Sequence, residues 1–259
     1  MDSLDVFGTV KAAYRSILDH PRVFLTVATP ILILAIVARQ VLPGPDTPEI
    51  GISHLAISLA AVVVFVYLRL VLALTWHRAV LLGRRDPENL FGLSARFWRF
   101  LAYGALYTVV VAVPGFMLGL ALSSEAAEGV SAGTMMREHA ALFVWTGIAQ
   151  IAVTVLAVAR FGFVFPAASI DRPTSLRTAW RESAGITGPF AAVLLCAVLP
   201  FSLVNHGLGY VLQTELAPLA YHAVFAISVV LDYVGFLVLI SAVSLVYAWR
   251  MKLRPDRVG

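Results

Sequence analysis

The chain has 259 residues, of which 60% are hydrophobic and only 13% are charged, and its net charge is +4. A soluble domain usually carries about a quarter charged residues, and a soluble protein this apolar would expose large patches that aggregate. The composition therefore excludes an ordinary soluble domain and predicts a protein whose solvent is the lipid bilayer.

Long apolar windows define the predicted spans, because a transmembrane helix needs about 20 consecutive apolar residues. Six windows qualify: 23–42, 54–76, 99–122, 140–165, 187–212 and 219–248. The first is not typical of a cleaved signal peptide, since its apolar run is too long and an amphipathic segment precedes it. The single cysteine, Cys196, excludes an intramolecular disulfide. We expect an all-α integral membrane protein with six transmembrane helices in one domain, residues 1–259.

The basic residues predict the orientation of these spans. They precede the first window, lie between windows two and three and between four and five, and follow the sixth: Lys11, Arg15, Arg22, Arg78, Arg84, Arg85, Arg96, Arg99, Arg172, Arg177, Arg181, Arg250, Lys252, Arg254 and Arg257. The alternate loops carry mainly acidic residues: Asp46, Glu49, Glu125, Glu128, Glu138 and Glu215. Because Lys and Arg favour cytoplasmic loops, both termini are expected in the cytoplasm.

Outer loops are then expected near 43–53, 123–138 and 213–218. The positive charge predicts contact with anionic lipid headgroups on the cytoplasmic side. Nucleic-acid binding is not expected, because the basic residues are spread over four short segments and no recognised nucleic-acid-binding motif accompanies them.

Three sets of markers recur at one period along the chain. Tyr14-Arg15, Trp98-Arg99 and Trp180-Arg181 are 84 and 82 residues apart, and Pro30, Pro114 and Pro200 are 84 and 86 residues apart within the odd spans. His54, His139 and His222 are 85 and 83 residues apart, at the outer start of the even spans. These intervals predict three repeats, approximately 1–84, 85–170 and 171–259.

Each repeat is expected to contain a cytoplasmic amphipathic helix, an outgoing span kinked at its proline and a returning span. Because each unit crosses twice, the three units share one orientation and are expected to surround an axis along the membrane normal.

The amphipathic helices are predicted from the 3.6-residue period. In the first, an apolar face forms from Leu4, Phe7, Val10, Tyr14 and Ile17. The second is expected to begin at Asp86, with Pro87 at its first position and an apolar side from Leu90, Leu93 and Phe97. The third begins near Thr174 and presents Leu176 and Trp180. An apolar face with basic flanks suits a helix in the headgroup layer, where the Tyr, Trp and Arg markers act as anchors or as a docking surface for a cytoplasmic partner.

The segment Arg160-Phe-Gly-Phe-Val-Phe-Pro166, followed by Ser175-Leu-Arg-Thr-Ala-Trp180-Arg181, resembles part of a group of six-span bacterial membrane proteins. The group includes the YciC-like proteins and the membrane domain attached to some glycerophosphodiester phosphodiesterases. The resemblance covers about 25 residues. It implies a six-helix fold in the bacterial inner membrane, and it implies no catalytic residues for this chain.

Two charged side chains are expected deep within the membrane. Counted from the outer His markers at about 1.5 Å per residue, Asp232 lies about 15 Å and Arg69 about 22 Å deep. An ionisable side chain at this depth is costly unless it is paired. We therefore expect a salt bridge between spans two and six, with a structural role or a role in handling solute or protons; a protonated, unpaired Asp232 is the other alternative. Gln150 lies at a similar depth and is expected to complete the network, whereas Arg160 should reach the inner headgroups.

The outer histidines His54, His139 and His222 would converge if the repeats close symmetrically. Three imidazoles and one open position can bind zinc. They lack local ligand spacing, so ordinary interfacial roles are the main interpretation and a metal site is the alternative. No cofactor is expected. His206, which follows Asn205, is expected to line a cavity or to bond a neighbouring backbone group.

Three functional classes stay open. The absence of a nucleophile motif or phosphate-binding loop favours a non-enzymatic structural or accessory protein that packs against other membrane subunits or a second copy. The alternative is a small-solute or ion permease that uses Arg69 and Asp232. The third class is a membrane-embedded enzyme that acts on lipid. The cytoplasmic residues that could bind a lipid phosphate offer no nucleophile: Trp76, His77, Arg78 and Arg84. A continuous polar cavity reaching Asp232 would favour transport, whereas a dry core and an exposed face of small residues would favour assembly.

Overall fold

The computed structural model of the protein describes residues 3–41, 52–83, 94–122, 138–212 and 217–253. Every regular element in these ranges is helical. The elements are α1 (Val6–Asp19), α2 (Pro21–Val23), the π-helical turn η1 (Phe24–Ala28), α3 (Thr29–Val41), α4 (Ile52–Leu82), α5 (Ala95–Ala121), α8 (Ala140–Phe161), α9 (Val164–Ser169), α10 (Leu176–Ser183), α11 (Thr187–Val211) and α12 (Pro218–Arg250). The predicted all-α class is confirmed for the described part of the chain.

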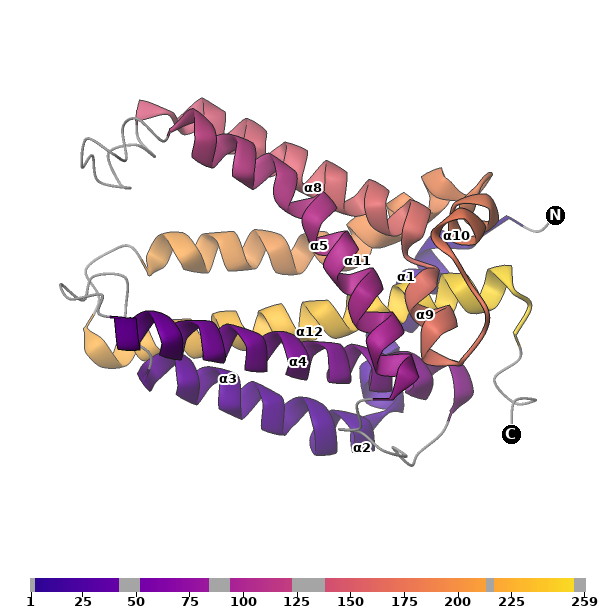
Figure 1. The fold of residues 1–259 in the computed structure, drawn as a ribbon, viewed down its shortest axis with the longest axis horizontal. Helices are drawn as coiled ribbons and strands as arrows, with labels where there is room; N and C mark the ends of the chain where they lie inside the picture. Colours follow the sequence, from indigo (N-terminus) through magenta and orange to yellow (C-terminus); the bar gives the residue numbers. More distant parts are fainter. Residues whose placement is uncertain (1–2, 42–51, 84–93, 123–137, 213–216, 254–259) are drawn as a thin grey trace.

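Several helices have the length and composition of membrane spans. Five qualify within the described ranges: Ala60–Leu82, Ala95–Ala121, Ala141–Phe161, Thr187–Gly209 and Ala220–Arg250. A sixth is counted if α1 and the run Pro21–Val37, which meet at a bend of 62°, form one span. In Figure 1 most of the long helices run roughly along the horizontal axis and α5 crosses obliquely. Helices α1, α9 and α10 and the C-terminal end of α12 lie at one end, here called the α1 end. The described chain is therefore compatible with a multi-pass membrane protein.

The bend after α1 has a local cause. Pro21 is the first residue of α2, and a residue before proline is disfavoured in the α-helical region. His20 accordingly leaves the helix, with φ −119° and ψ 49°. At its other end α1 begins at Asp5, whose carboxylate accepts a hydrogen bond from the Gly8 amide at 2.9 Å. Proline and N-cap together delimit a short helix ahead of the first apolar run.

The three marker prolines lie within helices. Pro114 and Pro200 are interior residues of α5 and α11. Pro30 is the second residue of α3, and only Thr29 separates it from the π-helical turn η1. Because proline has no N–H and crowds the carbonyl four residues earlier, such a wider turn relieves the helix. The Thr29 hydroxyl donates to the Phe24 carbonyl at 3.1 Å and adds a bond across this turn.

The short helices α1 and α10 pack against the long helices at the α1 end. In α1 the predicted apolar residues Leu4, Val10, Tyr14 and Ile17 pack against the core, but Phe7 is 81% exposed and Val6 packs in its place. Helix α1 lies against α11 and α12, and α10 lies against α8.

The second predicted amphipathic helix lies partly outside the described residues, which exclude 84–93. Helix α5 begins after Ser94, whose hydroxyl accepts from the Phe97 amide at 3.3 Å. Trp98 and Arg99 therefore belong to the first turns of a long helix, whereas the other two marker pairs lie in short separate helices. The Ser94 cap starts a helix that then continues into the apolar run without a break.

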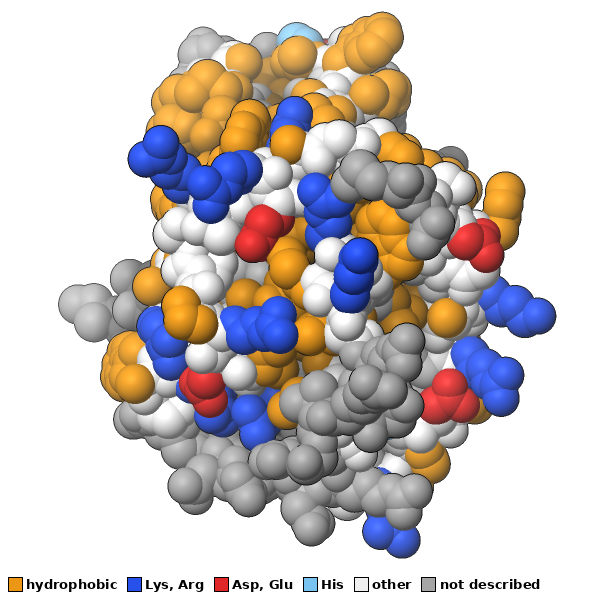
Figure 2. Space-filling view, turned by 90° about the vertical axis from the view of Figure 1, so that its right-hand side faces the viewer, with side chains coloured by type: hydrophobic (Ala, Val, Ile, Leu, Met, Phe, Trp, Pro, Cys, Tyr) orange, Lys and Arg blue, Asp and Glu red, His pale blue; other side chains and the backbone are white. Residues whose placement is uncertain are grey.

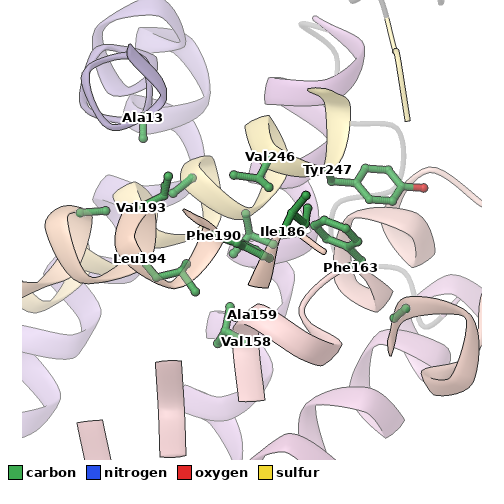
Figure 3. Packing of buried hydrophobic residues seen from close by; sticks show 14 of the residues in the cluster. Ala13, Val158, Ala159, Phe163, Ile186, Phe190, Val193, Leu194, Val246 and Tyr247 are labelled. Carbon is green, nitrogen blue, oxygen red and sulfur yellow. The ribbon is translucent and has the colours of Figure 1, made fainter. Parts of the chain in front are cut away.

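The densest packing lies at the α1 end. The buried residues of α4, α11 and α12 fall in Val71–Leu81, Phe190–Ala197 and Tyr233–Tyr247, mainly in the halves of these helices nearest that end. Phe163 packs against Phe190 and Tyr247, with ring centroids 5.3 Å and 5.5 Å apart. Figure 3 shows these rings among Ile186, Val193 and Val246. Packing is looser beyond this end, and the candidate site lies in the middle of α4 and α12.

Candidate functional site

An ion pair links the middle of α4 to the middle of α12. The Arg69 Nη2 atom donates to Asp232 Oδ2, which is the contact that the sequence predicted between spans two and six. The Arg69 guanidinium also lies over the Tyr233 ring, 5.3 Å from its centroid, and over the Phe236 ring, at 4.9 Å. A cation over an aromatic face gains about 0.5 kcal/mol or more, so the two rings add to the stabilisation of the buried part of the arginine.

The pair is only partly covered by the rest of the chain. The side chains of Arg69 and Asp232 are 41% and 54% exposed. Both belong to helices that qualify as membrane spans, so hydrocarbon around them would be unfavourable. The exposed part of the pair therefore requires water, another protein or a solute.

A cavity of about 150 Å³ lies beside the pair, between α4, α11 and α12. Its polar lining consists of Arg69, Asp232, Ser202 and Asn205, and the remaining lining residues are apolar. Among the described residues, two buried polar atoms of this lining lack a hydrogen-bond partner: Arg69 Nε and Asn205 Oδ1. A buried polar group without a partner costs about 1–3 kcal/mol, so a water or a bound molecule here would satisfy one donor and one acceptor.

A second cavity of about 220 Å³ adjoins the first, between α8, α11 and α12. The two share Val198, Ser202 and Leu239 as lining residues. Gln150 lines the second cavity, but its Nε2 atom donates to the Val111 carbonyl of α5 at 2.6 Å. The expectation that Gln150 completes the ion-pair network is therefore wrong: α8 packs against α5, and the amide reaches that neighbour instead.

Helix α11 contributes Ser202 and Asn205 to the cavity beside the ion pair, and the sequence analysis singled out only Asn205 and its neighbour His206. Asn205 lines the cavity, while the His206 Nδ1 atom lies 2.7 Å from the Ser202 carbonyl of its own helix. Ser202 was not predicted at all. Its spacing of three residues from Asn205, which places both on one face of a helix, was the available signal.

The predicted outer histidine triad is only partly described. His139 is the N-cap of α8, and the His222 ring lies 5.7 Å from that of Tyr221 in the first turns of α12. His54 lies in α4, but its side chain is outside the described part. The described residues hold no group of three His, Cys, Asp or Glu side chains suited to a metal ion. The triad therefore stays a prediction.

The set considered for binding a lipid phosphate does not form an open site. Trp76 and His77 are buried: the Trp76 indole donates to Ser241 Oγ at 2.8 Å, and His77 Nδ1 lies 2.7 Å from Ser244 Oγ. Arg78 donates to the Ser169 carbonyl at 3.0 Å. Arg84 lies outside the described residues. The first two residues are structural because α12 packs over this face of α4.

The predicted interfacial anchors differ in what they contact. The Tyr14 hydroxyl donates to the Ala197 carbonyl at 3.0 Å, and Arg15 pairs with Asp19 on the exposed side of α1. Trp98 and Arg181 are exposed. Trp180 packs against Phe161, and the Arg160 guanidinium lies 4.3 Å from the Trp180 ring centroid. Figure 2, which looks onto the α1 end, shows the Lys and Arg side chains gathered there.

Asp171 joins the loop after α9 to the start of α5. Its carboxylate accepts from Arg96, and from Arg99 at 3.1 Å. The hydrogen bond from Arg96 holds the pKa of the Asp171 carboxyl below its ordinary value of 3.8, and the charges of Arg96, Arg99 and Arg78 act in the same direction. Its backbone is in the left-handed region, with φ 58°, which short polar side chains tolerate.

No protein-family model, curated protein or solved structure matches this chain. The resemblance of residues 160–181 to the YciC-like group therefore stays a prediction.

Proposed function

We propose that this protein is a non-enzymatic, multi-pass membrane protein that serves as a structural or accessory subunit of a larger membrane assembly. Its proposed location is the inner membrane of a bacterial cell, with both termini in the cytoplasm. The partly exposed Arg69–Asp232 pair is consistent with this role, because a covering subunit would remove it from lipid.

Helix α5 carries the proposal. No residue from Leu101 to Ala121 is buried, although this stretch has the composition of a membrane span. Gly115 and Gly119 are exposed on this helix at a spacing of four, and a Cβ atom built on either would meet nothing within 4 Å. A Gly-x-x-x-Gly pattern lets two helices approach closely within a membrane. The face is therefore suited to contact with a helix from another chain.

Cysteine cross-linking in intact membranes tests this role. In a Cys196→Ser background, Gly115→Cys should form a cross-link to one specific chain, either a second copy or another subunit. The double variant Gly115→Leu/Gly119→Leu should lose its co-purifying membrane protein, whereas Gly147→Leu in α8, also at an open position, should keep it. A protein that stays monomeric and forms no cross-link in native membranes would contradict the proposal.

We also infer that the helices form three parallel repeats around an axis along the membrane normal, each preceded by an interfacial helix. The helix contacts support this arrangement. Each pair of spans packs together: α3 with α4, α5 with α8, and α11 with α12. Helix α1 packs on the third pair and α10 on the second, so these two short helices each lie against another unit. An experimental structure with Pro30, Pro114 and Pro200 at different depths would rule the repeat out.

A small-solute or ion permease is the second candidate, because the cavity beside the Arg69–Asp232 pair adjoins a second cavity. The opposite charges of the pair cancel, so a small polar solute would fit this lining better than a multiply charged one. The test is uptake into proteoliposomes. Transport that Asp232→Asn abolishes and Thr108→Ala leaves unchanged would favour the permease over the assembly subunit.

A further inference from the structure

A groove of about 210 Å³ lies between α5 and α8 at the α1 end. Its walls include Tyr103, Leu106 and Val110 of α5, Ala157 and Phe161 of α8, and Leu176 of α10. Apart from the hydroxyl groups of its tyrosines, the lining side chains are hydrocarbon. The groove is separate from the cavity beside Arg69 and Asp232, since the two have no lining residue in common.

The groove runs along the direction of the spans. Tyr103 and Val110 are seven residues apart in α5, which corresponds to about 10 Å at 1.5 Å per residue. The Tyr103 hydroxyl donates to the Thr174 carbonyl at 3.2 Å, so this end of the groove lies at the level of the loop before α10. The other end points toward the middle of the bundle. A narrow apolar groove of this length and direction is suited to bind part of one acyl chain.

Guanidinium groups flank the end of the groove next to α10. Arg99 lies one helical turn before Tyr103 on α5, and Arg160 directly precedes Phe161 on α8. Arg99 shares Asp171 with Arg96, which leaves one positive charge in that cluster. Arg160 lies over the Trp180 ring and forms no ion pair with another described residue. The local charge is therefore positive where the acyl groove begins.

We propose that this groove binds one anionic phospholipid from the leaflet at the α1 end, with an acyl chain along α5 and the phosphate facing Arg99 and Arg160. Hydrocarbon burial supplies the affinity of the chain, and the guanidinium groups bind the phosphate. Their positive charge repels the cation of a zwitterionic headgroup, and so favours an anionic lipid. The site gives a role to the basic residues at one end of an apolar groove that no side chain of the described protein fills. It does not depend on the proposed subunit or permease role.

Native mass spectrometry of the purified full chain tests the site. The protein in detergent is mixed with equal amounts of phosphatidylglycerol and phosphatidylcholine that carry the same acyl chains. Phosphatidylglycerol should be retained about tenfold more strongly, a difference of about 1.4 kcal/mol, because only phosphatidylcholine brings a cation next to the guanidinium groups. Equal retention of the two lipids would overturn the proposal.

Two kinds of variant separate the headgroup from the chain. Arg99→Gln/Arg160→Gln should abolish the preference for phosphatidylglycerol, and Leu106→Trp, which fills the groove without touching the Asp171 cluster, should weaken retention of both lipids. Arg15→Gln, an exposed arginine on α1, is the matched control and should change neither. Melting temperatures establish that each variant is folded.

Glycerol phosphate, which has the headgroup chemistry without chains, distinguishes a lipid site from a free phosphate site. It should not compete with phosphatidylglycerol at equal concentration. Competition by glycerol phosphate, or retention that Leu106→Trp leaves unchanged, would contradict the acyl groove.

Discussion

The hydroxyl oxygens of Ser16 on α1 and Ser241 on α12 lie 2.6 Å apart in a buried hydrogen bond between residues at opposite ends of the chain. Ser241 also accepts from the Trp76 indole of α4 and donates to the Leu237 carbonyl, at 2.8 Å each. One hydroxyl therefore ties three helices together in the core at the α1 end.

Replacing Ser241 should destabilise the fold through this network. In Ser241→Ala the buried Trp76 indole loses its acceptor, which costs about 1–3 kcal/mol of unfolding free energy. Thermal unfolding in detergent measures the loss. Thr108→Ala, which removes an exposed hydroxyl bonded to the Gly104 carbonyl, is the control and should change stability by less than about 0.5 kcal/mol. An equal loss of unfolding free energy in the two variants would show that the Ser241 network does not stabilise the fold.

The Arg69–Asp232 pair predicts a coupled pattern of stability. Arg69→Ala and Asp232→Asn should each lower stability by roughly 1–3 kcal/mol, between the values of exposed and buried pairs, because one charge is left without its partner. The double variant Arg69→Leu/Asp232→Leu should recover much of the loss. A double-mutant cycle measures the coupling, and strictly additive losses would show that the two residues do not interact.

Asp171 predicts a dependence of stability on acid. Because its pKa in the folded protein is lowered, its contribution to stability is complete above its ordinary pKa of 3.8 and is lost as the pH falls below that value toward the folded pKa. The melting temperature of Asp171→Asn should therefore lie below wild type near pH 6, and the difference should shrink below pH 3.8.

Asp19→Asn removes a carboxylate from an exposed i,i+4 pair with Arg15 and is the control, with little effect at either pH. A difference in melting temperature between Asp171→Asn and wild type that stays constant down to pH 3 would contradict the role of the Arg96 contact.

Gly162 predicts a steric requirement where α8 ends. A Cβ atom at this position would lie 2.4 Å from the Val158 carbonyl oxygen, so the backbone of the turn into α9 must shift to accept it. Gly162→Ala should lower stability by about 1–3 kcal/mol, the usual range of backbone strain. Gly147→Ala, in open space within the same helix, should be neutral or stabilising because alanine favours a helix. Thermal unfolding of both variants measures the contrast.

Reporter fusions test the predicted orientation. Alkaline phosphatase fused after Gly259 should be inactive, since that end is expected in the cytoplasm, and fusion within 123–137 should be active. A green fluorescent protein fused at the same two places should give the reverse pattern. An active phosphatase at the C-terminal end would overturn the orientation.

The sequence by itself predicted the helical class, the approximate spans and the ion pair. Apolar windows and the cost of a lone charge in a membrane are properties of a segment or of two residues, so they can be evaluated before the fold is known. Asp232 and Arg69 were recognisable because few charged residues lie within the apolar windows.

Only the tertiary structure decided what the polar residues between helices contact. Helical periodicity shows which residues share a face, but it does not show which neighbour that face meets. Trp76 and His77 look like interfacial residues in the sequence, yet α12 covers them and provides Ser241 and Ser244 as partners. Gln150 reaches α5 for the same reason, because the packing of helices around each side chain, and not its depth along the span, determines its partner.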